Sequence, residues 1–288
     1  MTDGSQAHKT LFCNTFIDSH RSFTPSELPW PKIDAISIDR LRAIPFWSVA
    51  VMAERNAGRM VTAYAKTLTD PLIAEALALQ GIEETRHAEL LDEMLRRYGV
   101  PVAEKQLPPL DVSERAFLDF GYEECIDSFF GFGIFGLARQ IQLFVPELTD
   151  IFEVVLLEEA RHVTFFVNWI AYERIRRGRG AMPLQAAATA LGYARALKRI
   201  VTTFAPAASG PKTQVGFAAE GAFSILEDVT WRSFLGSCVS ENDRYLAAMP
   251  PGLRVPTVLP MLARMALAFP RLRSRERSQT QPPMSKAA

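Results

Sequence analysis

The sequence predicts an all-α protein in which two long helical hairpins are followed by additional helices. Apolar residues recur at helical spacing, and no segment shows the alternation of apolar and polar residues that marks a strand. Two segments that open with proline, at Pro71 and at Pro146, also repeat one another. With 288 residues, 48% of them hydrophobic, the chain can bury a sizeable helical core.

Proline, glycine and capping residues delimit the expected helices. Asp70 is expected to cap a helix whose first position is Pro71, and Gly99 ends it. Pro146 opens a later helix in the same way. The expected helices cover residues 46–68, 71–98, 113–144, 146–178, 183–204, 214–248 and 258–269.

Four regions follow from this pattern. Residues 1–45 contain four prolines and little periodicity, and we expect an extended N-terminal arm laid over the domain. Residues 46–180 hold the two hairpins, and residues 181–270 add helices that pack on them. Residues 271–288 form a basic, polar tail that we expect to be disordered.

Composition excludes several classes of function. Thirty-two basic and 32 acidic residues cancel, which gives no reason to expect nucleic-acid binding. Three widely spaced cysteines suggest neither a disulfide framework nor a cysteine metal site. The polar start is unlike a signal peptide and no apolar run has membrane-spanning length, so a cytoplasmic location is expected. The helix at 258–269 and the arginines after it could touch a membrane surface, although packing on the domain is the favoured interpretation.

The pentapeptide Glu-Glu-x-Arg-His occurs twice, ending at His87 and at His162. In each copy the second glutamate, Glu84 or Glu159, stands thirteen residues after the helix-opening proline. Residues three apart share a helix face, so each Glu-x-x-His pair can bind one metal ion. A single copy is more often a solvated helix face with ion pairs. Two copies at the same distance from the start of their helices favour a two-metal site.

Such a site needs further carboxylates from the other two helices, to bridge the metals and balance their charge. Glu54 is a lone acid among apolar residues, and it is as far from the intervening turn as Glu84 is, as an antiparallel hairpin requires. The candidates in the third helix are Glu124, which we prefer, and the alternatives Asp127 and Glu123.

On these residues, roughly 46–178 of the chain resembles the ferritin-like di-iron carboxylate superfamily. That group includes monooxygenase hydroxylases, aldehyde-deformylating oxygenases, N-oxygenases and ribonucleotide reductase small subunits. The resemblance implies a ferritin-like four-helix bundle with additional C-terminal helices. It implies bridging or chelating roles for Glu84 and Glu159 and more terminal roles for Glu54 and Glu124. The implied ligands are Glu54, Glu84, His87, Glu124, Glu159 and His162.

The resemblance extends to residues around the ligands. Glu83 and Glu158 would hydrogen-bond the ligand histidine of the opposite helix and orient it; the alternative is a simple ion pair with a nearby arginine. Ser128 could turn its hydroxyl to the oxygen-binding side, although a packing role is favoured. The Phe- and Gly-rich stretch 129–136 is interpreted as core packing, with an apolar substrate channel as the alternative.

By this resemblance we expect an O2-dependent di-iron oxygenase or oxidase acting on a small, partly apolar organic substrate. Hydroxylation, desaturation and N-oxygenation stay open, as do manganese or mixed manganese–iron in place of two irons. The sequence has no Gly-rich nucleotide fingerprint and no cysteine cluster, so electrons would come from an external donor such as a ferredoxin or reductase. The alternatives are a ferroxidase or manganese catalase, and a non-enzymatic helical scaffold. A homodimer is possible.

Overall fold

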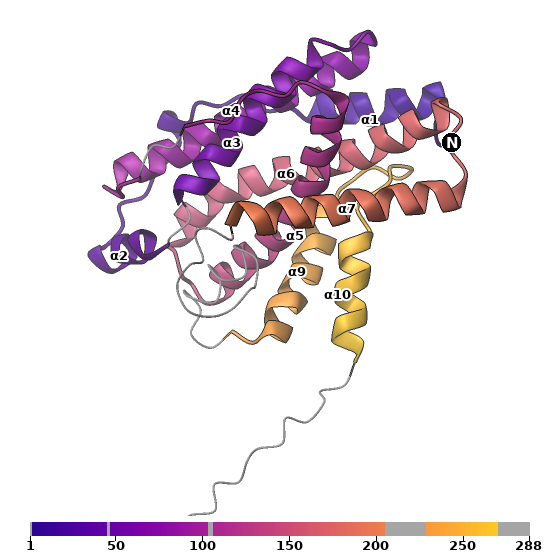
Figure 1. Cartoon of the computed structure of the whole chain (residues 1–288). Helices are drawn as coiled ribbons and strands as arrows, with labels where there is room; N and C mark the ends of the chain where they lie inside the picture. The colour runs from indigo at the N-terminus through magenta and orange to yellow at the C-terminus, as the bar shows by residue number, and fades with distance from the viewer. Residues whose placement is uncertain (1, 45–46, 103–105, 205–228, 270–288) are drawn as a thin grey trace, which may run out of the picture.

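The computed structural model describes residues 2–44, 47–102, 106–204 and 229–269, and all regular structure within them is helical (Figure 1). This confirms the predicted all-α class. A single 3-10 turn, η1, covers Pro25–Glu27. The described α-helices are α1 (Gln6–Ser19), α2 (Ala35–Ala43), α3 (Trp47–Ala65), α4 (Pro71–Arg97), α5 (Glu114–Gln140), α6 (Pro146–Arg176), α7 (Met182–Phe204), α9 (Trp231–Leu246) and α10 (Val258–Ala268).

The predicted helix boundaries at the two prolines are correct. The Asp70 side chain accepts hydrogen bonds from the backbone N–H groups of Leu72 and Ile73, and Pro71 follows at the first helical position. Pro146 opens α6 in the same position. Gly99 follows the end of α4 with a φ of 61°, a left-handed conformation that glycine adopts without a steric penalty.

The prediction of an extended N-terminal arm is wrong for residues 6–19 and 35–43, which are helical. Ser5 caps α1, and the helix packs against both α4 and α6. Its buried side chains include Phe12, Cys13 and Phe16, a stripe too short to stand out as a periodic pattern. The four prolines that suggested an extended chain all come after this helix.

Two other predictions extend beyond the described residues. The expected helix 214–248 is described only as α9, from Trp231 to Leu246, and its first part lies outside the described residues. The expected disordered tail, 271–288, also lies outside them.

The four long helices α3 to α6 contact one another in a ring, in which α3 and α6 each touch both α4 and α5. Helices α3 and α4 approach closely at two glycines. A Cβ atom on Gly58 would lie 2.4 Å from the hydroxyl oxygen of Thr85, and one on Gly81 would lie 2.2 Å from that of Thr62. Glu54 stands one turn before Gly58, so this close approach brings it against the centre of α4.

The Phe- and Gly-rich stretch of α5 packs against α9. A Cβ atom on Gly133 would lie 2.2 Å from the Cys238 sulfur, and one on Gly136 would lie 2.5 Å from a side-chain carbon of Glu241. Phe130 stacks on an aromatic ring of α9 as well. These contacts support the core-packing interpretation of residues 129–136.

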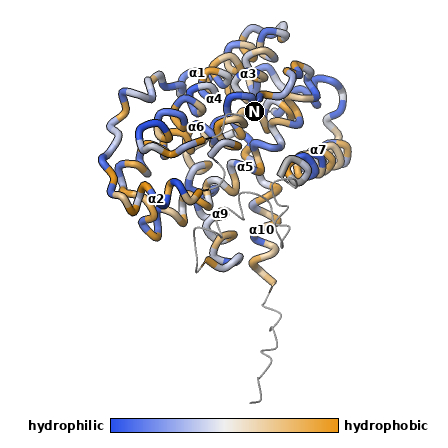
Figure 2. Tube along the Cα trace, turned by 60° about the vertical axis from the view of Figure 1, so that its left-hand side comes forward, coloured by the Kyte–Doolittle hydropathy of each residue, from blue (hydrophilic) through white to orange (hydrophobic). Residues whose placement is uncertain are grey.

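Helix α10 packs on α9 and α5 through a narrow strip that includes Pro260 and Ala263. Figure 2 shows α10 at the edge of the molecule. Met261 and Met265 of α10, and Phe269 directly after it, are exposed. Packing on the domain is therefore present, and contact with a membrane surface stays a prediction. Within the described part of the chain, no helix is both long enough and apolar enough to cross a membrane.

Candidate metal centre

The two Glu-Glu-x-Arg-His segments face each other across the centre of the helix ring. Helix α4 carries His87 and α6 carries His162, and their ring centroids are 5.6 Å apart. Both imidazoles are almost completely buried, and both Nδ1 atoms lack a hydrogen-bond partner. A buried, unpaired nitrogen is costly unless something binds it.

Glu84 and Glu159 lie between the two histidines, and each carboxylate offers one oxygen to each imidazole. Glu84 places Oε1 3.1 Å from Nδ1 of His162 and Oε2 3.9 Å from Nδ1 of His87. Glu159 places Oε1 3.1 Å from Nδ1 of His87 and Oε2 3.5 Å from Nδ1 of His162. Each of the two Nδ1 atoms, one on His87 and one on His162, therefore faces an oxygen from both carboxylates.

Glu54 joins the position beside His87, with Oε2 3.6 Å from its Nδ1 atom. Glu54, Glu84, His87 and Glu159 offer ligand atoms that all lie within 4.8 Å of one another, so this cluster could hold a metal ion. The Glu54 side chain is 25% exposed and that of Glu159 12%, whereas Glu84 is fully buried. Access from solvent therefore comes from the side of Glu54 and Glu159.

Of the three candidates on α5, Glu124 lies nearest the centre of negative charge. Burial raises the pKa of Glu124 well above its ordinary value, and the charges of Glu159 and Glu84 raise it further. Glu124 does not belong to the four-residue cluster of Glu54, Glu84, His87 and Glu159, and neither does His162. The alternative Glu123 is 2.6 Å from Nε of Arg199 on α7, outside the cavity. The other alternative, Asp127, is exposed.

Glu83 and Glu158, the first glutamates of the two motifs, each bind the histidine of the opposite helix. Nε2 of His87 donates to Glu158 over 2.9 Å, and Nε2 of His162 donates to Glu83 over 2.8 Å. Glu158 also accepts a hydrogen bond from Arg86, and Glu83 accepts one from an arginine of the other motif. Both expected roles, arginine pairing and histidine orientation, are therefore present together. When either imidazole is neutral, its proton stays on Nε2, which donates outward, and the lone pair of Nδ1 faces the cavity.

Three further side chains hydrogen-bond these carboxylates, although Oε2 of Glu84 has no hydrogen-bond partner among the described residues. Gln80 donates to Oε1 of Glu84 over 3.0 Å, and Ser128 lies 3.4 Å from Glu159, which agrees with the alternative to the favoured packing role. His20 donates to Glu83 over 2.7 Å. Gln80 stands one turn before Glu84, so helical spacing could have identified it. His20 is 63 residues from its partner, and nothing in the local sequence indicates the contact.

The metal-free cavity holds more negative than positive groups. Burial lowers the pKa of His87, but the hydrogen bond to Glu158 and the nearby carboxylates of Glu159 and Glu54 outweigh it, and the net pKa lies well above its ordinary value. Burial also lowers the pKa of His162, but the charges of Glu84 and Glu159 and the hydrogen bond to Glu83 raise it well above its ordinary value. Burial raises the pKa of Glu54 to about 7. Nitrogen and carboxylate oxygen donors suit divalent iron or manganese, and such cations would compensate the buried charge.

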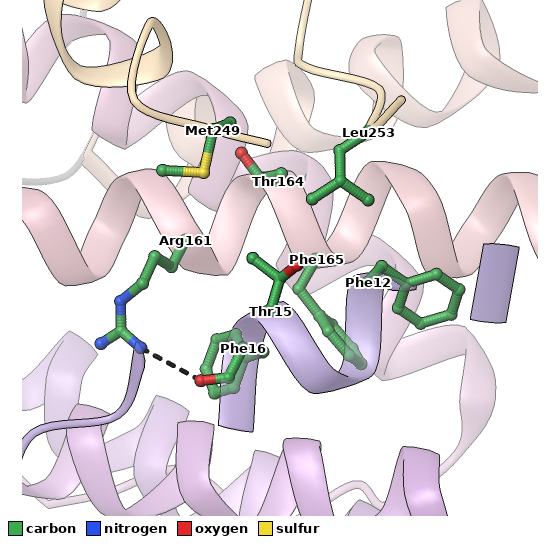
Figure 3. A pocket seen from close by; sticks show the side chains of 8 residues that line it. All are labelled: Phe12, Thr15, Phe16, Arg161, Thr164, Phe165, Met249 and Leu253. Atoms are coloured by element: carbon green, nitrogen blue, oxygen red, sulfur yellow. Dashed lines mark hydrogen bonds between the residues drawn. The ribbon is translucent and has the colours of Figure 1, made fainter. Parts of the chain in front are cut away.

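A small cavity lies behind this centre, between α1, α6 and the segment 247–257 (Figure 3). Arg161, Phe16 and Thr164 are among the side chains that line it, and none of the six expected ligands does. Its volume of about 10 Å³ has room for roughly one water molecule, which is too little for an organic substrate.

Comparison with known proteins adds no assignment: no family model, curated protein or solved structure matches this chain. The metal identity and the reaction therefore have to be argued from the side chains themselves.

Proposed function

We propose that this protein is a carboxylate-bridged two-metal oxidoreductase, and specifically an O2-activating non-haem di-iron oxygenase or oxidase. In this proposal α3 to α6 form a ferritin-like four-helix bundle. One observation carries it: Glu84 and Glu159 each direct one oxygen to each of two unpaired imidazole nitrogens. An ordinary network of ion pairs has no need for two carboxylates that both span the same two histidines.

The distances support each ligand except Glu124, which is assigned from the charges of Glu159 and Glu84 beside it and from the resemblance. One metal position would be held by His87 and Glu54 and the other by His162 and Glu124, with Glu84 and Glu159 bridging them. Four carboxylates would balance the charge of two divalent ions, and the imidazoles add none. Iron is the proposed metal, with manganese or a mixed pair as the alternative.

When bound, the metal pair would supply reductive activation of O2. The chain's residues prepare the site for it. Glu83 and Glu158 hold the imidazoles in one orientation, and burial of both histidines and of Glu84 keeps water from the inner side. O2 and a small, partly apolar organic molecule would approach from the side of Glu54 and Glu159. Electrons would come from an external donor such as a ferredoxin or reductase, and a cytoplasmic location stays a prediction.

The alternative function is metal handling or peroxide removal, as in a ferroxidase or manganese catalase, because the same donor set serves those reactions. The helices that follow α6 favour the oxygenase. Helices α7, α9 and α10 all contact α5, so the helix that carries Glu124 is covered by more structure than a bundle of four helices alone provides.

Anaerobic loading with Fe²⁺, followed by metal analysis, tests the two-metal site. About two irons per chain are expected for the wild type and for Glu123→Gln, whereas Glu124→Gln should lose part of the iron. Glu123 is the matched control because it lies on the same helix but pairs with Arg199. Fewer than one tightly bound metal in the wild type would refute the proposal.

O2 consumption with a chemical reductant separates the two functions. The proposed oxygenase or oxidase consumes more O2 when a suitable organic molecule is present, and a screen of small apolar compounds should find one. Fe²⁺ oxidation that no organic compound alters would support the ferroxidase. Rapid breakdown of hydrogen peroxide by the manganese form would support the catalase.

A further inference from the structure

The N-terminal arm covers the outer arginines of both motifs. Arg86 donates to the backbone oxygen of Arg21 over 2.7 Å, and its guanidinium carbon lies 4.1 Å from the ring centre of Phe23. Arg161 donates to the backbone oxygen of Phe16 over 3.5 Å and lies 5.1 Å from the centre of that ring (Figure 3). The segment 16–23 thus forms a further layer outside the two histidine–glutamate pairs.

This layer makes different hydrogen bonds to Glu83 and to Glu158. Glu158 accepts hydrogen bonds from one arginine and one histidine. Glu83 accepts the corresponding two and a third from Nδ1 of His20, whose side chain is 18% exposed. The ring of Phe16 also stacks on His162, with centroids 5.8 Å apart. In the described part of the arm, no side chain hydrogen-bonds Glu158.

The third donor determines how firmly Glu83 holds its histidine. His20 and Arg161 both bind Oε1 of Glu83, which leaves Oε2 to His162 alone. With Oε1 held from two directions, the carboxylate has one favoured orientation, and Nδ1 of His162 is directed at Glu84, 3.1 Å away. Without His20, only Arg161 would hold Oε1, and the carboxylate could rotate.

We propose that His20 is a positioning residue for the metal position at His162, that it acts through Glu83, and that it makes the two metal positions unequal. The inference rests on the proposed two-metal site. Loss of a side chain that hydrogen-bonds a ligand histidine directly, as Glu83 does, typically lowers metal affinity by about 10- to 100-fold, and His20 lies one contact further out. Because Glu83 keeps two of its three donors, removal of His20 is expected to weaken one position by roughly tenfold.

Co²⁺ titration of the full-length, metal-free protein tests this, with the visible spectrum as the readout. The variants are His20→Ala, His20→Asn and, as the control, Arg21→Ala. Asparagine carries an N–H donor close to the position of Nδ1, whereas Arg21 contributes only its backbone oxygen. Thermal unfolding of each metal-free variant is measured alongside.

We expect two binding steps in the wild type, and in His20→Ala one step weakened roughly tenfold with an altered spectrum while the other is unchanged. His20→Asn should restore most of the affinity, and Arg21→Ala should match the wild type. Unchanged steps in His20→Ala, or equal weakening of both steps together with a lower melting temperature, would overturn the proposal. A wild type that binds fewer than two Co²⁺ ions would instead overturn the two-metal function.

Discussion

Replacing Glu54 by glutamine should stabilise the metal-free protein at high pH and weaken its metal binding. Burial raises the pKa of Glu54 to about 7, compared with 4.5 for an exposed glutamate. Between these two values the folded chain binds more protons than the unfolded chain, so stability falls as pH rises through this window. At pH 8 the wild type carries the full cost of the ionised carboxylate, and the glutamine variant carries none.

The magnitude follows from the shift and from the exposure of the side chain. One pKa unit corresponds to about 1.4 kcal/mol, which gives roughly 3 kcal/mol for a fully buried carboxyl. The Glu54 side chain is 25% exposed, so solvent screens part of this cost and about 1–2 kcal/mol is expected. For a chain of this length that corresponds to a rise in melting temperature of roughly 2–6 °C.

The assay is thermal unfolding followed by circular dichroism, at pH 5.5 and pH 8, with a chelator present. Glu54→Gln should melt higher than the wild type at pH 8 and by a smaller margin at pH 5.5, where only part of the cost is present because this pH lies inside the window. Iron titration of the same variant should show at least one weakened position. If Glu54 is instead an ion-pair partner of His87 in a structural cluster, the variant will melt lower at pH 8. That result would refute the reasoning and favour the helical scaffold without a metal.

Three further outcomes are expected. His87→Ala combined with His162→Ala should abolish iron binding, as measured by metal analysis, because each position loses its only imidazole; unchanged iron content would exclude these ligands. Gly58→Ala should lower the free energy of unfolding by about 1–3 kcal/mol in urea, because the added methyl meets a threonine hydroxyl of α4 at 2.4 Å. Gly131→Ala is the control, since a Cβ there meets nothing within 4 Å. Asp70→Ala should cost about 1 kcal/mol in the same measurement, through loss of the cap of α4, and no change would contradict the capping role.

The starts of α4 and α6, and the equal distance of each motif from its helix start, could be predicted because their causes are local. Asp70 caps α4 within three residues of itself, and Pro71 and Pro146 each occupy a first helical turn. Glu84 and His87 share a face for the same reason, since three residues are almost one helical turn. Helix α1 was missed because its apolar stripe is short and depends on packing against α4 and α6.

The rotation of α5 and the contacts of the arm were decided only by tertiary structure. Successive residues point about 100° apart around a helix, so Glu123 and Glu124 cannot face the same neighbour. Packing turns Glu123 to Arg199 on α7 and leaves Glu124 near the charges of the cavity. The sequence by itself therefore determined which side chains share each helix face. Only the packed structure decided which helix faces meet and that His20 contacts Glu83, because such contacts depend on how whole helices are placed.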